Sequence, residues 1–350
     1  MKYPNIGNQK SDKKNIYWKC VYTFCATSVR VNHEKKHLVI TNDYDDVIID
    51  NKNIKKELSL LGVELIYLNF DTYDPGKFSK IFRNAFYKLQ VFERLSQEAL
   101  PSILLDSDIL WHKKDTVLDE IISKGEVLVL QDTYQRNNHP LKRSPHNLSM
   151  KDMGDTFYSI GIQSYNEPYP IWYGGEITGG SPKTFGVLAK NILELLDYCK
   201  EQEKNGNKIY FPNGSSIFDG DEFLSSFVYN SIDIEIYDTN KLHSKRLLTG
   251  EISNNVMDGD EKIPIWHVTS EKVTGLKKLF DEAINPNSEF WNTKNFTEYL
   301  GKFVGIPKRK FKKKSLPVKV KDLIYNQLRF LNSNRKKMIW WFHSRYISNK

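Results

Sequence analysis

Apolar and polar positions follow two different patterns along the first 132 residues. Apolar side chains three or four positions apart predict helices at 15–31 and 82–95, and further helices are expected at 52–61, which is polar, and at 116–123. Short apolar runs that end in polar residues predict strands at 37–43, 63–70, 102–106 and 126–132. Strands that alternate with helices are typical of a mainly parallel sheet with helices on both faces. Ligands of such sheets bind beyond the carboxyl ends of the strands.

The second half of the chain follows a looser pattern. Residues 133–183 have little periodicity and many Gly, Pro, Tyr and Asn residues, which predicts loops that are functional or mobile. Helices are expected at 184–204, 219–230, 275–284 and 293–304, with a late strand at 263–268. The predicted fold class is therefore α/β, a Rossmann-type mixed, mainly parallel sheet flanked by helices. We expect one domain over residues 1–306 and a helical, basic extension over 307–350.

Charge divides the chain in the same way. The net charge is +8, but residues 308–350 contain 14 Lys and Arg and one acid, a net charge of +13, which leaves −5 for the rest. Basic residues beside Trp340, Trp341 and Phe342 favour an amphipathic segment on an anionic membrane surface. A solvated, disordered extension is the alternative. Nucleic acid is not expected as a partner, because the aromatics cluster at one end of the segment.

Cysteine usage and hydropathy predict the compartment. Cys20, Cys25 and Cys199 are odd in number and lack metal-site spacing, which favours a reducing environment. No run reaches the roughly 18 apolar residues of a spanning helix, and the start, MKYPNIGNQK, has no signal-peptide core. We expect a cytoplasmic protein, peripheral at the inner face of the cytoplasmic membrane if the extension binds there.

Two aspartates lie at the end of the apolar strand predicted at 102–106. In PSILLDSDILW, Asp106 and Asp108 follow Ile103-Leu104-Leu105. A buried carboxylate is costly unless a cation or strong donors compensate it. Two carboxylates at i and i+2 can face one hard divalent cation, Mn²⁺ or Mg²⁺, which leaves coordination positions for water and phosphates. Two solvated acids in a polar loop are the alternative explanation.

The segment FRNAFYKLQVFERLSQEALPSILLDSDILW resembles the centre of GT-A-type, nucleotide-sugar-dependent glycosyltransferases, of the kind that builds bacterial polysaccharides and glycolipids. WYGGEITGG, GDEF and IWHVTSEKVTGLKK resemble further family segments in the expected order, over roughly residues 35–285. The resemblance implies a GT-A-like fold and transfer of a sugar from a nucleoside-diphosphate sugar, UDP being favoured. The acceptor would be a hydroxyl of a glycan or lipid-linked glycan, and the resemblance favours retention of the anomeric configuration.

The resemblance also implies roles for single residues. Asp106 and Asp108 would bind the metal with His267, and Asp221 or Glu222 would lie near the reacting carbon. The donor would be held by Arg83, Lys88, Asp106, Ser107, Asp108, Gly174, Gly175 and Lys278. If the reaction inverts instead, Asp132 or Asp221 could serve as the base.

Several of these residues also have ordinary structural explanations. A histidine within a strand, such as His267, is often a hydrogen-bonded core group, and acids in a first helical turn are favoured by the helix dipole. Arg83 and Lys88 could lie on a solvated helix face. Two other functions stay open. One is a phosphatase or phosphotransferase of the haloacid dehalogenase type, which also has D-x-D after a strand; the other is a non-catalytic carbohydrate- or membrane-binding protein.

Overall fold

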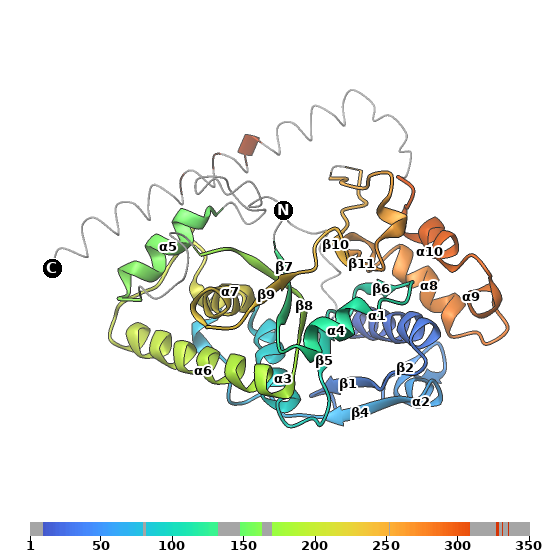
Figure 1. The fold of residues 1–350 in the computed structure, drawn as a ribbon, viewed down its shortest axis with the longest axis horizontal. Coiled ribbons are helices and arrows are strands. Elements are labelled where there is room, and N and C mark those ends of the chain that lie inside the picture. The colour runs from blue at the N-terminus through green and yellow to red at the C-terminus, as the bar shows by residue number, and fades with distance from the viewer. Residues whose placement is uncertain are drawn as a thin grey trace.

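The computed structural model describes residues 10–79, 82–131, 148–162, 170–251 and 253–308, together with 327, 328, 331 and 335. It shows strands flanked by helices, so the expected α/β class is confirmed (Figure 1). Asp132 and nearly all of the extension 307–350 lie outside the described residues.

The strands form mixed sheets. The main sheet has the order β5–β8–β7–β9, in which β8 is antiparallel to both neighbours and β7 is parallel to β9. Two further groups matter for the site: the parallel pair β1–β4, and the small sheet β10–β11–β6. The bounds are β1 His37–Thr41, β2 Ile48–Ile49, β3 Lys52–Asn53, β4 Val63–Tyr67, β5 Ser102–Leu105, β6 Ile109–Trp111, β7 Val127–Gln131, β8 Tyr173–Gly180, β9 Ile236–Asp238, β10 Ser244–Arg246 and β11 Ile265–His267.

Most helices lie close to their predicted positions, but α5 forms within residues 133–183, where loops were expected. Ser181 caps the longest of them, α6, by accepting a hydrogen bond from the Thr184 amide, and Pro182 follows at the first helical position. The described α-helices are α1 Lys10–Val31, α2 Ile54–Leu60, α3 Tyr87–Leu95, α4 Val117–Ser123, α5 Met150–Ser159, α6 Pro182–Lys204, α7 Asp221–Ser231, α8 Gly275–Ala283, α9 Glu289–Asn292 and α10 Phe296–Val304.

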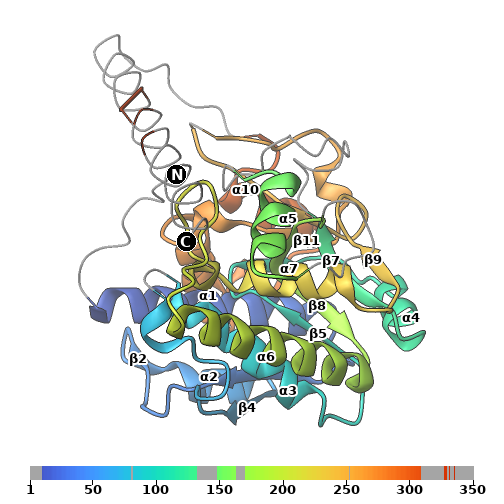
Figure 2. The same ribbon diagram turned by 90° about the vertical axis from the view of Figure 1, so that its left-hand side faces the viewer.

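The period-two pattern of β7 divides the core at the main sheet. Val127 and Val129 pack into the cluster formed with α3, α6 and α7, whereas Leu128 and Leu130 pack with α4 on the other side. Figure 2 shows α6 in front of β8 and β5. Both faces of the strand are therefore buried, as a continuous apolar run predicts.

A further core joins the two ends of the described chain. α1 packs against α8, with the rings of Tyr22 and Phe280 in edge contact at 5.6 Å, and Figure 1 shows these blue and orange segments side by side. Cys20 and Cys25 are buried on α1, and Cys199 is buried on α6. The carboxyl-terminal helices thus fix α1 beside β6.

The segment WYGGEITGG differs from its expected loop structure, because residues 173–180 form β8 in the centre of the main sheet. A side chain at Gly179 would meet the Leu128 side chain at 2.8 Å, so the glycine lets β8 lie close to β7. Strand periodicity is hidden here because four of the eight residues are glycines.

Candidate functional site

Asp106 and Asp108 lie in the turn between β5 and β6. The Asp106 amide donates to the Glu176 carbonyl of β8 at 3.0 Å, and the Val268 amide donates to the Asp108 carbonyl at 3.0 Å. These backbone bonds hold the turn between two sheets. Asp108 is only 2% exposed, whereas Asp106 is half-buried.

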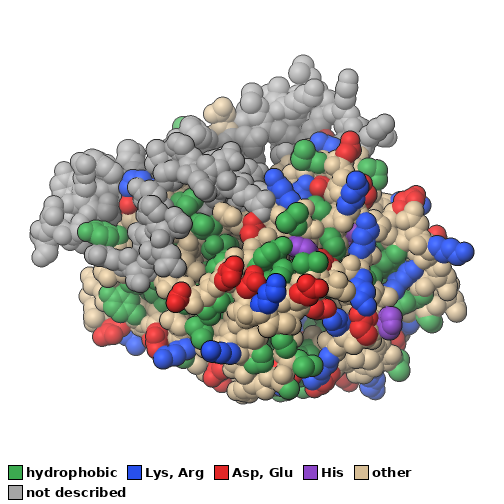
Figure 3. Space-filling view, viewed as in Figure 1, with side chains coloured by type: hydrophobic (Ala, Val, Ile, Leu, Met, Phe, Trp, Pro, Cys, Tyr) green, Lys and Arg blue, Asp and Glu red, His purple; other side chains and the backbone are tan. Residues whose placement is uncertain are grey.

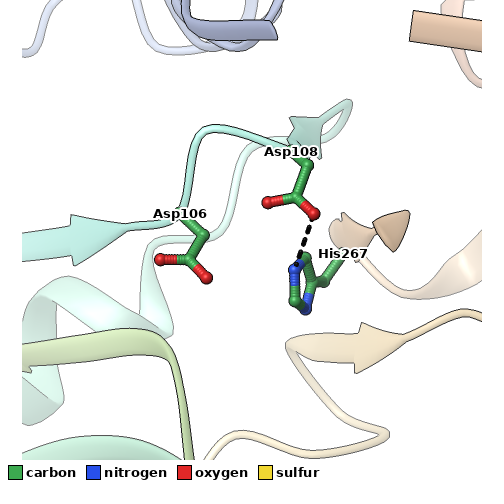
Figure 4. A group of neighbouring side chains, drawn as sticks. All are labelled: Asp106, Asp108 and His267. Carbon is green, nitrogen blue, oxygen red and sulfur yellow. Dashed lines mark ion pairs between the residues drawn. The ribbon is translucent and has the colours of Figure 1, made fainter. Parts of the chain in front are cut away.

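Strand register brings His267 to Asp108. β11 runs antiparallel to β6, and His267 lies opposite Ile109, the residue after Asp108. The imidazole Nε2 is 3.2 Å from the Asp108 carboxylate, and Figure 4 shows both carboxylates and the ring around one small space. One potential ligand atom from each of Asp106, Asp108 and His267 lies within 4.8 Å of the others. The three expected metal ligands are therefore neighbours.

Glu176 and Arg246 form a partly buried ion pair beside His267, at the ring nitrogen that faces away from Asp108. The Arg246 guanidinium donates to both carboxylate oxygens of Glu176, at 2.7 and 2.6 Å, and His267 Nδ1 lies 3.2 Å from the same carboxylate. Register again explains the contact, since Arg246 on β10 lies opposite His267 on β11. Sequence analysis missed both residues. For Glu176 there was a visible signal, a single charged residue in an otherwise uncharged, glycine-rich segment.

Lys88 links Asp106 to α7. Its ammonium is 2.7 Å from the Asp106 carboxylate and 3.5 Å from that of Asp221, and it donates to the Gly175 carbonyl at 2.6 Å. Glu222, the next residue, accepts from the Gly175 amide and from the Trp172 indole, each at 3.2 Å. The two adjacent acids thus have different partners, as their neighbouring positions on a helix require.

The structure places Lys272, rather than Lys278, at the aspartates. The Lys272 ammonium donates to the Asp108 carboxylate, and its side chain lines the same cleft. Lys278 is exposed on α8 and lines a separate hollow with Thr274, Glu289 and Tyr299. The short helical turn Thr269–Glu271 lies between His267 and α8, so Lys272 comes to the aspartates while Lys278, expected from the G-x-x-K pattern, lies further along on α8.

The remaining donor-site candidates lie at different depths. Arg83 is largely exposed at the cleft and paired with Asp74, and Ser107 lines the cleft between the aspartates. A side chain at Gly174 would meet the Glu176 carboxylate at 1.9 Å, and one at Gly175 would meet Asp221 and Lys88, each at 3.0 Å. Both glycines are therefore needed for the close packing of the charged groups.

A cleft of about 1740 Å³ opens over these groups. It is lined by the aspartate turn, by Lys272, by the first turn of α7 and by the carboxyl end of β1. Acidic, basic and apolar side chains are interspersed on the face of the molecule seen in Figure 3. The volume is ample for a ligand larger than a drug-sized molecule.

Buried ion pairs shift the pKa values of the cluster. Burial opposes the charge on Asp108, but His267 and Lys272 hold the pKa of its carboxyl far below the ordinary value. Burial would lower the pKa of His267, yet Asp108 and Glu176 raise it to about 9. Burial raises the pKa of Asp221 to about 6, against the opposing effect of Lys88. Perturbed groups in a cleft are typical of functional sites.

The donor set fits a hard divalent cation. Two carboxylates and one imidazole are ligands that Mn²⁺ and Mg²⁺ sites use. Five carboxylates (Asp106, Asp108, Glu176, Asp221 and Glu222) face three fixed cations (Lys88, Arg246 and Lys272), so the network is two charges negative when His267 is neutral. Binding would replace the proton on His267 and the Lys272 contact. Glu176 would not bind the metal itself but would orient the imidazole ring of His267 through their contact.

Comparison with known proteins adds little to this description. No family model and no curated protein sequence matches the chain. Among solved structures, the apo form of mouse xyloside xylosyltransferase 1 is similar, with 10% identity, a TM-score of 0.43, and coverage of 74% of this chain and 94% of that one. Within the described residues, no helix is both long and apolar enough to cross a membrane.

Proposed function

We propose that this protein is a metal-dependent glycosyltransferase that uses a nucleoside-diphosphate sugar, with a UDP-sugar as the first candidate. The observation that carries the proposal is the Asp106–Asp108–His267 group at a strand end, flanked by Lys88 and Lys272, under a large cleft. Clustered carboxylates alone would repel a diphosphate. Together with a divalent cation and two lysines they provide a site for one.

Each side chain has a role in this proposal. Asp106, Asp108 and His267 would hold Mn²⁺ or Mg²⁺, which supplies neutralisation of the departing diphosphate. Lys272 would leave Asp108 for the diphosphate oxygens, a role that we transfer from Lys278. Lys88 would keep Asp106 in place and hold Asp221 near the donor sugar.

The acceptor in this proposal is a hydroxyl of a glycan or lipid-linked glycan. Asp221 and Glu222 open α7 at the rim of the cleft, where a second substrate could approach the donor. We propose retention of the anomeric configuration on the basis of the sequence resemblance. Proton NMR of the first product, which distinguishes the two anomers by their coupling constants, tests this point.

Calorimetry with UDP and GDP, with and without Mn²⁺, tests the site. We expect one nucleotide to bind only with Mn²⁺, and binding to be lost in Asp106→Ala/Asp108→Ala. The matched control is Asp45→Ala/Asp46→Ala, which removes the same charge from two exposed aspartates outside the cleft lining. The control should bind like the wild type.

The outcomes separate the candidate functions. Hydrolysis of the corresponding nucleotide sugar, lost in the site variant, would support an enzyme over a binding protein. If no nucleotide binds under any condition, the proposal is wrong. Hydrolysis of a simple phosphate monoester in that case would favour the dehalogenase-type phosphatase instead.

A further inference from the structure

Two exposed tyrosines stack on each other where β1 and β4 end. Tyr67 is the last residue of β4, and Tyr44 follows the end of β1 by three positions. Their ring centroids are 5.2 Å apart, and the ring planes differ by only 19°. Figures 1 and 2 both show β4 at the outer edge of the molecule. This tyrosine pair presents aromatic surface to solvent, since Tyr44 is 60% and Tyr67 44% exposed.

Buried side chains support the tyrosine pair from the inside. The Lys55 ammonium lies 5.6 Å from the centre of the Trp18 ring and 4.9 Å from that of Tyr67. An ammonium over a ring is attracted by its negative face. Because Trp18 and Lys55 are buried, contacts run from the core outward to the exposed Tyr44 ring. The Tyr44 hydroxyl is also fixed, as it donates to the Asn69 side-chain oxygen at 2.6 Å.

The Tyr44 ring is thus held in place before any ligand binds. A mobile surface side chain must be ordered when a ligand binds, and this ordering costs free energy. Here stacking on Tyr67 and the hydrogen bond to Asn69 have already ordered the ring. A rigid and exposed aromatic ring is well suited to contact a flat ligand surface.

The surroundings of Tyr44 favour a neutral sugar ring over a ligand rich in phosphate. An aromatic face carries partial negative charge, so it attracts the partly positive C–H groups on the flat side of a sugar. Asp45 and Asp46, the next two residues, are both exposed. Their carboxylates would repel phosphate groups. Lys14 does not reverse this sign, because it is paired with Asp43 at 2.8 Å.

We propose that Tyr44, stacked on Tyr67, binds an inner sugar of a neutral oligosaccharide acceptor. Asn42 and Asp43 line the cleft, whereas the tyrosine pair lies beside its lining. A sugar on Tyr44 is therefore not the one that reacts above the aspartates. The inference rests on the proposed function and makes its acceptor more specific: a glycan of two or more sugars rather than a single sugar.

Binding to an array of neutral oligosaccharides of two to six sugars tests the tyrosine pair. The full chain is applied with and without Mn²⁺ and UDP, and calorimetry then measures the affinity for an oligosaccharide that binds. We expect Tyr44→Ala to lower this affinity about tenfold or more, because the stacking surface is lost. Tyr44→Phe keeps the ring and should lose less. Tyr158→Ala, which removes an exposed tyrosine of α5, is the control and should bind like the wild type.

The same affinity for wild type and Tyr44→Ala, or no binding to any member of the array, would overturn the proposal. Tyr44→Leu, which keeps apolar bulk without an aromatic face, gives the same comparison if Tyr44→Ala does not fold.

Calorimetry of UDP with Mn²⁺ on the same variant separates this inference from the proposed function. We expect Tyr44→Ala to bind UDP like the wild type. Glycan binding that depends on Tyr44, in a protein that binds no nucleotide, would support the sugar contact and reject the glycosyltransferase. Loss of UDP binding in Tyr44→Ala would assign the ring to the nucleobase and contradict the inference.

Discussion

Glu176 is 1% exposed and contacts both Arg246 and His267. Burial opposes its charge, but Arg246 and His267 hold the pKa of its carboxyl well below the ordinary value. A buried carboxylate that orients a ligand histidine is a frequent second layer in metal sites. The position of His267 thus depends on a residue that makes no contact with the cleft.

Replacement of the Glu176 carboxylate tests whether this residue orients His267 for metal binding. Glu176→Gln keeps the shape but removes the charge that holds His267 and Arg246. We expect Mn²⁺ affinity, measured by calorimetry, to fall about 10- to 100-fold. Glu194→Gln on the exposed side of α6 is the control and should leave the affinity unchanged. Equal affinities in all three proteins would mean that Glu176 serves folding alone.

The two candidate lysines make opposite predictions. Lys272→Met removes the cation at Asp108, so we expect UDP affinity in the presence of Mn²⁺ to fall about tenfold or more, as for loss of a charged hydrogen bond. Lys278→Met removes an exposed lysine from the separate hollow and should bind UDP like the wild type. The reverse pattern would restore the role to Lys278.

Asp221 gives a pH-dependent prediction. Its folded-state pKa of about 6 exceeds the ordinary value of 3.8, mainly because of burial. The folded chain therefore binds more protons, and this group's contribution to stability falls as pH rises from about 4 to 6. Asparagine cannot titrate, so the stability of Asp221→Asn relative to wild type should increase by up to about 3 kcal/mol between pH 4 and 7.

Urea unfolding of the metal-free proteins at several pH values measures this change. Asp46→Asn, at an exposed position, is the control for the loss of one charge. A stability difference between Asp221→Asn and wild type that stays constant with pH would show that Asp221 does not titrate in this range.

Some of these residues could be found from the sequence and others could not. Asp106 and Asp108 were visible because two acids directly follow an apolar run. Arg246 was invisible, since its contact with Glu176 depends on the pairing of β10 with β11, a register set by residues far apart in the chain. Lys272 stood five positions after His267 but had no distinguishing local pattern.

At the scale of elements, β8 organises the site. It pairs with β5 and β7, carries Glu176, and presents Gly174 and Gly175 to charged neighbours. Most helices were predictable from their sequence patterns, but α5 was missed because it lies in a stretch expected to form loops, and α7 is buried on nearly all sides. β8 was not predictable, because tertiary packing against β7 rather than local side-chain alternation makes it a strand.

Two glycine substitutions distinguish a glycine needed for close packing from a glycine in an ordinary helical position. Gly174→Ala places a methyl group against the Glu176–Arg246 pair, so we expect a loss of about 1–3 kcal/mol in unfolding free energy. Gly186→Ala lies within α6, where the added carbon meets only Ser96 at an ordinary 3.6 Å. It should raise stability by about 0.5–1 kcal/mol through lower chain entropy. Urea unfolding of both variants checks the signs, and stabilisation by Gly174→Ala would contradict the packing.

At the scale of the whole molecule, charge separates body and extension. The net charge of +13 over residues 308–350 contrasts with −5 over the remainder. These residues lie almost wholly outside the described part of the chain, so membrane binding and the domain boundary at 306/307 stay predictions. Attachment at an anionic surface would suit a lipid-linked acceptor.

Vesicle sedimentation tests the extension. The full chain should bind phosphatidylserine vesicles and not neutral phosphatidylcholine vesicles, because each basic residue near an anionic surface adds about 1 kcal/mol. Deletion of residues 308–350 should abolish binding. Replacement of Trp340, Trp341 and Phe342 by alanine keeps the charge and should weaken it partially. Full binding by the shortened chain would assign the membrane contact to the body.

The three buried thiols make the folded chain nearly inert towards thiol reagents. Burial raises the pKa of Cys20, Cys25 and Cys199 to about 12, so almost no reactive thiolate is present at neutral pH. Alkylation must therefore wait until the surrounding structure opens. Cys20 and Cys25 lie in the core shared by α1 and α8, and Cys199 lies in the core around α6. The rates at which thiol reagents modify Cys20 and Cys25, compared with the rate for Cys199, therefore measure how often each of these two cores opens.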